Sequence, residues 1–445
     1  MSTTNTDSLS KKEVDRLTGE MTESCQRIID LFSTLNERQI LGPRLAIVNP
    51  ARWEAGHVAW FYEGWILRNL YEAQPLLANA DALYKSADVA HDGRWDLLLP
   101  TQAETLAFLK EVLERSVRWV KSGAASGRDA YFFRLGTYHS DMHAEALTYT
   151  RQTLGYPAPA PRVTKTDRLV LAPEPGFEPH DVSVPGGAFS LGATPDVPFV
   201  FDNEKWAHSV DVPPFRIAAT AVTYGEVRRF VDDGGYQRRE LWTDEGWEWR
   251  GRAGAEHPAY WVRTDNADWR LRRYDQEVIL PEWCAIIHVN WHEANAYCAW
   301  AGRRLPTEAE WELAASTEPT SDGQGIALAK RHYPWGNESP TPDRANLDWA
   351  AGGTIDVRAL PVGDSAFGVR QMVGNVWEWT STVFGPYPGF ERDPYEEYSE
   401  PWFGDHMVLR GGCWATRSRL IRNTWRNFYK PDRRDVMCGF RTCAR

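Results

Sequence analysis

The sequence predicts an α+β protein of two dissimilar parts, a four-helix bundle followed by a domain of short strands and loops. Apolar residues recur at helical spacing in four segments before residue 156. A proline-rich stretch at 155–162 then ends the pattern, because proline lacks a backbone donor and restrains the residue before it. Beyond it, strand-like pieces alternate with glycine, proline and aspartate. We therefore expect domains at 1–156 and 181–445, joined by a linker at 157–180.

The four expected helices follow one another along the first part. They cover 11–36, a segment that begins after Pro50, 102–120 and about 130–154. The intervening stretch 72–100 shows no regular pattern and is expected to be an irregular excursion that could form one wall of a site. Helices of this length predict an up-and-down bundle, in which metal sites are built from side chains on facing helices.

Three histidines on two of these helices form a candidate metal site. His139 and His143 lie four residues apart and therefore share a helix face. His57, on the second helix, can supply a third imidazole. Three neutral imidazoles hold a divalent ion and leave coordination positions open, and both Fe(II) and zinc suit such donors. Most of the other eight histidines are expected to be ordinary core or surface groups.

Composition restricts the function class. A formal charge of -11 argues against a nucleic-acid partner, and the sequence has no apolar run long enough to cross a membrane. The first twenty residues lack the apolar core of a secretory signal, so a cytoplasmic protein is expected. Six cysteines without a CxxC pair predict reduced thiols. The 22 tryptophans favour a loop-rich second domain held together by aromatic side chains.

Seven short motifs succeed one another in the second part. They are Val184 to Gly187, Val289 to Trp300, Arg304 to Glu312, Tyr333 to Asn337, Gly374 to Thr380, Arg410 to Trp414 and Gly439 to Arg441. In this order they resemble the formylglycine-generating-enzyme (sulfatase-modifying factor) fold, which is related to C-type lectins. Thr307 and Glu310 predict a capping box that opens a helix. Trp377 and Trp379 are expected to be core residues.

The first part resembles a DinB-type bundle, and the combination is similar to the sulfoxide synthases of ergothioneine and ovothiol biosynthesis. The resemblance implies a mononuclear non-heme Fe(II) enzyme that joins a sulfur donor to the imidazole of histidine or of hercynine, its trimethyl betaine, using O2. The family pattern of a histidine followed by HxxxHxE corresponds to His57, His139, His143 and Glu145. Glu145 is expected to hydrogen-bond a ligand histidine. The chain shows no methyltransferase domain, which favours the ergothioneine type.

The same resemblance places further candidates in the second domain. Tyr395, and after it Tyr398, correspond to a segment that faces the iron, where a phenol can donate a proton to reduced oxygen. For Tyr398, loop packing is an almost equally good interpretation. Arg426 and Asn427 open a segment matching the family's substrate loop, in which Asn427 suits a betaine carboxylate. Aromatic faces there suit its trimethylammonium group.

Several residues depart from the family pattern. Phe428 and Tyr429 replace the usual Trp-Asp, His91 and Arg94 occupy positions where two arginines bind the carboxylates of gamma-glutamylcysteine, and Met142 replaces a frequent glutamine. All of these positions hold substrates, so a donor with fewer charges is expected. Selenoneine synthases resemble this pattern. They take selenium from the neutral selenosugar 1-seleno-N-acetylglucosamine, and the resemblance therefore predicts carbon–selenium bond formation on hercynine, with Trp95 and Trp402 suited to a sugar ring.

Three other interpretations stay open at the level of sequence. The first is an ergothioneine sulfoxide synthase that uses cysteine or gamma-glutamylcysteine. The second is a formylglycine generator, which needs a pair of reactive cysteines that the spacing of Cys413, Cys438 and Cys443 does not reproduce. The third is a non-catalytic binding protein on a lectin-like scaffold. Oligomeric state and the oxidation level of the product are left open by the sequence.

Overall fold

Helices make up the first of two units, Met1–Ala160 and Pro161–Arg445, into which the chain divides. The computed structural model describes residues 8–160 and 172–445, so residues 161–171 of the predicted linker lie outside the described residues. The helices of the first unit are α1 (Lys11–Ser33), α2 (Glu37–Leu41), α3 (Ala51–Tyr62), η1 (Glu63–Arg68), α4 (Asn69–Tyr71), α5 (Ala80–Tyr84), η2 (His91–Trp95), α6 (Gln102–Lys121) and α7 (Ala130–Thr153).

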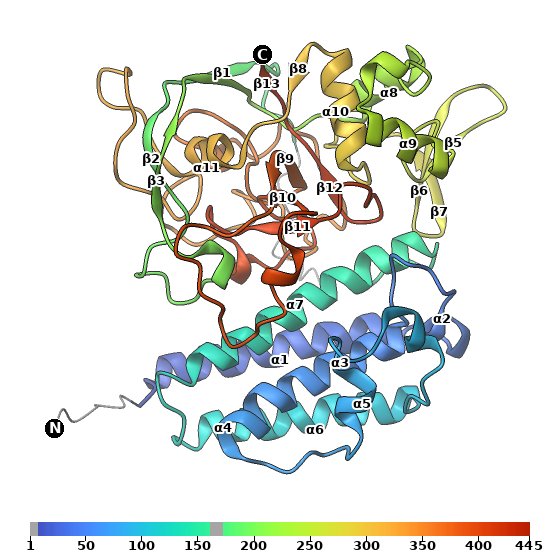
Figure 1. Cartoon of the computed structure of the whole chain (residues 1–445), viewed down its shortest axis with the longest axis vertical. Helices are drawn as coiled ribbons and strands as arrows, with labels where there is room; N and C mark the ends of the chain where they lie inside the picture. The colour runs from blue at the N-terminus through green and yellow to red at the C-terminus, as the bar shows by residue number, and fades with distance from the viewer. Residues whose placement is uncertain (1–7, 161–171) are drawn as a thin grey trace. The chain divides into compact units, whose positions relative to one another are not determined.

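The four predicted helices are present as α1, α3, α6 and α7, and they pack on one another (Figure 1). Their starts follow from local chemistry. The Ser10 hydroxyl accepts the free N–H of Glu13 at the start of α1, and Thr101 with Glu104 forms a capping box at the start of α6. Apolar residues at helical spacing fill the space between the four helices. The resemblance to DinB bundles stays a prediction.

The helix that begins at Ala51 continues beyond α3 through a π-helical turn, η1, into α4. Glu63 opens this turn with its side chain fully buried, and one carboxylate oxygen accepts the N–H of Leu76 at 2.5 Å. The segment predicted to be irregular, 72–100, contains two short helices, α5 and η2. Both η2 and α5 lie in the unit that holds the three histidines.

The second unit is built from short strands and helices, as predicted. Its helices are η3 (Asp202–Glu204), α8 (Tyr224–Asp232), η4 (Arg239–Leu241), α9 (Asp244–Ala253), α10 (Trp291–Trp300), α11 (Glu308–Ser316), η5 (Pro361–Gly363), η6 (Glu400–Trp402) and η7 (Ser418–Leu420). Its strands are β1 (Asp181–Val184), β2 (Gly187–Leu191), β3 (His208–Val212), β4 (Phe215–Ala218), β5 (Trp261–Arg263), β6 (Trp269–Arg273), β7 (Gln276–Ile279), β8 (Arg303–Arg304), β9 (Trp377–Val383), β10 (Met407–Arg410), β11 (Asn427–Tyr429), β12 (Cys438–Gly439) and β13 (Cys443–Ala444).

Two four-stranded sheets organise this unit, with strand orders β1-β4-β13-β8 and β11-β10-β9-β12. In both sheets the last strands of the chain pair with much earlier ones, so the two ends of the unit are tied together (Figure 1). The predicted capping box at Thr307 and Glu310 is present at the start of α11. Trp377 and Trp379 are buried core residues, as predicted.

A buried ion pair joins three of the sequence motifs of this unit. The Arg441 guanidinium donates two hydrogen bonds of 2.7 Å to the Glu378 carboxylate, and neither side chain is exposed. The Trp311 indole donates to the same carboxylate at 2.7 Å. Buried charges persist only when paired and hydrogen-bonded, so this arrangement explains why tryptophan, glutamate and arginine occur together in the motifs.

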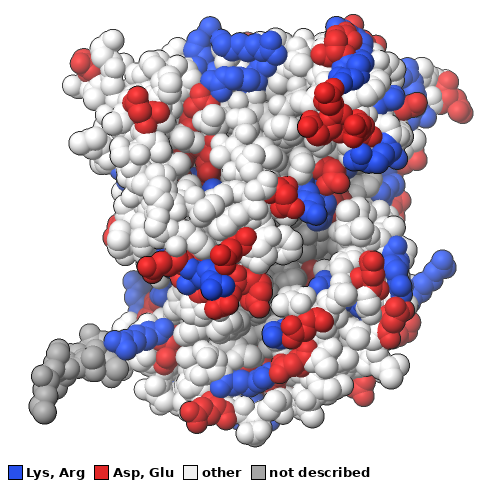
Figure 2. Space-filling view, viewed as in Figure 1, with Lys and Arg blue, Asp and Glu red and all other residues white. Residues whose placement is uncertain are grey.

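Acidic and basic side chains are intermixed over most of the face drawn in Figure 2. Among the described residues, no helix combines the length and the apolar character that crossing a bilayer requires.

Candidate functional site

Three imidazoles converge in the first unit. The Nε2 atoms of His57 and His139 are 3.2 Å apart, and those of His139 and His143 are also 3.2 Å apart. His57 lies on α3, and the other two lie one turn apart on α7. Among the described residues, these three form the one group of histidine, cysteine and carboxylate side chains close enough to hold a metal ion, with ligand atoms within 4.8 Å of one another.

In two of these rings, the hydrogen bond made by Nδ1 determines that Nε2 faces the centre of the cluster. Nδ1 of His57 lies 2.8 Å from the Tyr84 carbonyl oxygen, which can only accept. Nδ1 of His143 lies 2.9 Å from Oε1 of Glu54. A neutral imidazole has one donor and one acceptor nitrogen, so we assign the protons to Nδ1 and the lone pairs to the inward Nε2 atoms.

Electrostatics favour the neutral, metal-binding form of the rings. Burial, and after it the neighbouring His143, holds the pKa of His57 well below its usual range. Burial and then His143 and His57 do the same for the pKa of His139. With no ion present, Nε2 of His139 could donate one proton at most, whereas the Nε2 lone pairs of His57 and His143 both lie 3.2 Å from it. One of the two lone pairs would therefore lack a donor. A cation at the centre satisfies all three nitrogens, so the donor set fits a divalent metal ion.

Local packing explains the orientation of the His57 ring. Gly56 lets the Tyr84 ring lie against α3, because a Cβ atom at Gly56 would come within 2.3 Å of that ring. The Tyr84 carbonyl thereby reaches Nδ1 of His57. The Trp53 ring stacks on His57 at a centroid distance of 4.8 Å, and Phe61 stacks on His139 at 3.6 Å. The rings are therefore fixed before any ion binds.

Glu54 is a site residue that sequence reasoning did not identify. It is 1% exposed and holds His143 across two helices, whereas Glu145 was the carboxylate predicted for that kind of role. Glu145 is buried on α7. The position of Glu54 three residues before His57 puts both on one face of α3, which is the feature of the sequence that could have indicated it.

The Glu54→Gln substitution should weaken metal binding about 10- to 100-fold, because an amide is a poorer acceptor for the imidazole N–H and removes a negative charge near the ion. Anaerobic competition against a chelator measures the affinity directly. Glu63→Gln is the matched control, since Glu63 is a buried carboxylate of the same helical run that accepts a hydrogen bond from the Leu76 N–H and does not belong to the histidine group. Equal affinities for the two variants would remove Glu54 from the site.

The predicted donor-binding residues of the first unit are mostly engaged with the protein itself. The Arg94 guanidinium lies 3.7 Å from the centre of the Trp53 ring and donates to Oδ1 of Asn49 at 2.6 Å. Nε2 of His91 bonds to the Val48 carbonyl at 2.8 Å. Met142 is half-buried on α7, next to His143. The stack of Arg94, Trp53 and His57 connects η2 to the histidine cluster.

In the second unit, Tyr395 and Tyr398 lie on the loop between β9 and η6, with ring centroids 5.7 Å apart. The Tyr398 ring stacks on Phe201 at 4.3 Å and lies edge-on to Phe428 at 5.8 Å. Burial raises the pKa of both phenols, so each stays protonated at neutral pH and can donate a hydrogen bond. This packing is compatible with both interpretations of Tyr398, whose catalytic role stays a prediction.

The predicted substrate loop forms β11 and the residue before it. All three nitrogens of the buried Arg426 guanidinium donate within the protein, to the Glu308 carboxylate and to the carbonyls of Asn203 and Gly385. Arg426 therefore anchors the segment, and its contact with substrate stays a prediction. Asn427, Phe428 and Tyr429 are partly exposed along the edge strand of their sheet. Phe428 stacks on Phe384 at 4.0 Å.

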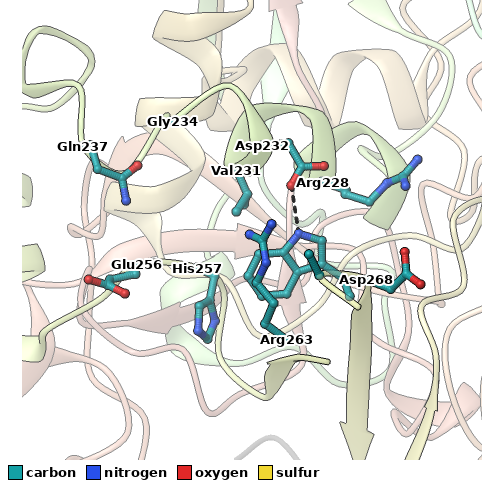
Figure 3. A pocket seen from close by; sticks show the side chains of 11 residues that line it. Arg228, Val231, Asp232, Gly234, Gln237, Glu256, His257, Arg263 and Asp268 are labelled. Carbon is teal, nitrogen blue, oxygen red and sulfur yellow. Dashed lines mark hydrogen bonds between the residues drawn. The ribbon is translucent and has the colours of Figure 1, made fainter. Parts of the chain in front are cut away.

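A separate hollow of about 620 Å³ lies between α8 and the β5–β6 hairpin of the second unit (Figure 3). Trp269 donates to Oδ1 of Asp232 at 2.9 Å, and Arg263 lies over the Trp269 ring. The hollow contains none of the predicted site residues. Its lining consists of Arg228, Val231, Asp232, Gly234, Gln237, Glu256, His257, Arg263, Ala267, Asp268 and Trp269.

Comparison with known proteins agrees with this two-part organisation. Residues 169–445 match the sulfatase-modifying factor enzyme 1-like domain family. A formylglycine-generating enzyme of Streptomyces coelicolor is 30% identical and covers 61% of this chain, with 92% of its own length matched. The fold and these matches define a protein whose second unit is a sulfatase-modifying-factor domain.

Relatives that match nearly the whole chain define its family more narrowly. Hercynine oxygenases of Mycolicibacterium smegmatis and Mycobacterium tuberculosis are 36% and 37% identical, each over 89% of this chain and 91% of the relative. The chain belongs to the hercynine oxygenase family, an assignment that agrees with the family resemblance predicted from the sequence.

Proposed function

We propose that the chain is an O2-dependent non-heme Fe(II) enzyme that forms a carbon–chalcogen bond on the imidazole of hercynine. Family membership supports an oxygenase that acts on hercynine, since that is the activity named for its whole-chain relatives. The single observation that carries the proposal is the convergence of the His57, His139 and His143 Nε2 atoms. A bound iron ion would supply open coordination positions at which donor and O2 are activated.

The remaining roles belong to side chains of the protein. Glu54 and the Tyr84 carbonyl hold two of the rings in the tautomer that presents Nε2 to the ion. We assign Tyr395 as the phenol that donates a proton to reduced oxygen, and Tyr398 as its packed neighbour. Asn427, with the aromatic faces of Phe428 and Tyr429, suits the carboxylate and trimethylammonium of a betaine.

We further propose that the donor is a selenosugar such as 1-seleno-N-acetylglucosamine. Arg94 is the one arginine of the η2 turn, and it keeps its positive charge because its partners, the Trp53 ring and the Asn49 side chain, are neutral. His91 bonds to a backbone carbonyl. One guanidinium pairs with one carboxylate at a time, whereas gamma-glutamylcysteine carries two, so a single arginine here supports a donor with fewer charges.

The alternative is an ergothioneine sulfoxide synthase that uses cysteine or gamma-glutamylcysteine. In that reaction the imidazole C–H and the thiol S–H are lost and a C–S bond forms. One oxygen atom of O2 stays on sulfur, and the other leaves as water with the two hydrogens. Whole-chain similarity to hercynine oxygenases is compatible with either donor.

The cysteines argue against a formylglycine generator. The six cysteines lie within the described residues, none of them forms a disulfide, and five of them are buried. Burial raises the pKa of Cys284 to about 11 and that of Cys443 to about 12. Such thiols are protonated at neutral pH and are poor nucleophiles, so we rank this activity below an oxygenase. A lectin-like binding role also ranks below it, because that role leaves the three-histidine group unexplained.

The test is a donor comparison. Iron-loaded enzyme is supplied with hercynine, air and one donor at a time, and the product masses are measured. We expect the selenosugar conjugate of hercynine to form faster than any conjugate of cysteine or gamma-glutamylcysteine. Efficient sulfoxide formation from gamma-glutamylcysteine would replace the selenium assignment with the alternative. Absence of any hercynine conjugate with all three donors would reject the oxygenase proposal itself.

A further inference from the structure

A short buried turn in the second unit contacts both of its predicted site segments. This turn, Asp202–Lys205, consists of η3 and the residue after it, and we refer to it as the η3 segment. Asp202, Asn203 and Glu204 are each at most 1% exposed. Charged and amide groups are rarely so deeply buried unless they have specific partners, so the partners of these residues are informative.

The η3 segment holds both ends of the loop that bears the tyrosines. At one end, Nζ of Lys205 is 2.5 Å from Oδ1 of Asp393. At the other end, the Asn203 amide donates to the Ser399 hydroxyl at 3.0 Å, and that hydroxyl donates to the Asp202 carboxylate. The loop from Asp393 to Ser399, which we call the tyrosine loop, is therefore fixed at its first and last residues.

Between these two anchors an aromatic contact fixes the middle of the loop. Phe201, which directly precedes the η3 segment, stacks on Tyr398 with an interplanar angle of 25°. The Tyr395 carbonyl accepts the Tyr398 N–H in a turn, and the two rings are close to each other. With Tyr398 packed and both ends tied, Tyr395 has little freedom except at its own side-chain torsions.

The same turn also holds the predicted hercynine-binding segment. The Glu204 carboxylate accepts from Nε of Arg422 at 2.8 Å and from the Thr424 hydroxyl at 2.9 Å. The Asn203 carbonyl accepts from Arg426 at 2.7 Å. Arg426 is the residue directly before β11, so the η3 segment, together with Glu308 and Gly385, holds the side chain next to Asn427.

We propose that the η3 segment positions two parts of the active site. It fixes the tyrosine loop and the segment at Asn427 relative to each other. The inference rests on the proposed function, because it assumes that Tyr395 and Asn427 face the substrates. Apolar contacts could anchor two loops at lower desolvation cost. Directional bonds from one rigid turn to both loops fix geometry, which catalysis requires to within a fraction of an ångström.

The Ser399→Ala substitution tests this directly, since it removes the hydroxyl that joins Asp202 and Asn203 to the loop. We expect the ratio of hercynine conjugate to oxidised donor to fall about three- to tenfold, with unchanged iron content. Hydrogen exchange of the peptide that spans 390–403 should speed up in parallel. Lys205→Met, at the other end of the loop and partly exposed, should change the ratio in the same direction if Ser399→Ala folds poorly.

Two comparisons make the result specific. Ser316→Ala removes an equally buried hydroxyl whose bond stays within its own helix, and it should leave the product ratio unchanged. Ser399→Thr, which keeps a hydroxyl, should restore most of the ratio. An unchanged ratio in both Ser399→Ala and Lys205→Met, beside an active parent enzyme in which Tyr395→Phe lowers the ratio, would overturn the positioning role. A parent enzyme that forms no conjugate would instead reject the proposed function.

Discussion

Replacing His139 with alanine should abolish iron binding and turnover together. His139 is the middle member of the cluster, with Nε2 at 3.2 Å from both of the other inward nitrogens. Its loss leaves two donors on different helices, which is too few to hold Fe(II) against water and chelators. We expect the iron content after anaerobic reconstitution to fall from about one ion per chain to near zero, as measured by metal analysis.

A matched control separates this effect from the loss of a buried imidazole. His292→Ala removes a buried histidine of the second unit that stacks on Trp249 and lies outside the cluster. This variant should keep its iron. If purified His139→Ala retained a full equivalent of iron and its activity, the three-histidine site would not be the metal centre.

The Arg441→Met substitution should lower the free energy of unfolding of the second unit by about 3–5 kcal/mol, because it leaves the Glu378 carboxylate uncompensated in the interior. The exposed fraction of both side chains is 0%, so water cannot take the place of the guanidinium. The carbonyls of Ala218, Ala219 and Arg370 each lose the hydrogen bond that Arg441 donates, although Ala219 keeps the one from the Arg370 N–H. Denaturant titration of the purified variant measures the change.

The double variant Arg441→Met with Glu378→Leu should recover part of this loss. Removing the carboxylate abolishes the unpaired charge, although the Trp311 indole then lacks its acceptor. A double variant less stable than Arg441→Met alone would show that the ion pair is not the source of the effect.

Much of the first unit could be predicted from the sequence, because its helices are determined by residues that are close together in the chain. The apolar spacing of 11–36 and 102–120 gave helices whose starts agree with α1 and α6. The spacing of His139 and His143 placed two imidazoles on one face, and the structure brings them together. What local pattern could not show is that a third ring, 82 positions before His139 in sequence, would lie 3.2 Å away. His57 was a candidate because it lies on another apolar helix, and the family resemblance supported that choice.

Residues that act across elements were harder to identify. Glu54 lies in an apolar helix and looks like any helical glutamate until α7 is packed against α3. The η3 segment has no periodicity, and a run of acidic and amide residues in a loop ordinarily indicates a solvated surface. Its partners lie about 190 to 220 positions away, at Asp393, Ser399 and Arg422. Only the assembled tertiary structure reveals such partners.

The low exposure of the cysteines would have a chemical consequence if the donor is a thiol or a selenol, as proposed. A side chain whose pKa is about 11, as for Cys284, is ionised in roughly one molecule in ten thousand at pH 7. Mixed disulfides or selenenyl sulfides with the donor would therefore form slowly on the protein. If the proposed reaction is correct, the low reactivity of these thiols would keep the protein's own sulfur out of the oxidation of the donor.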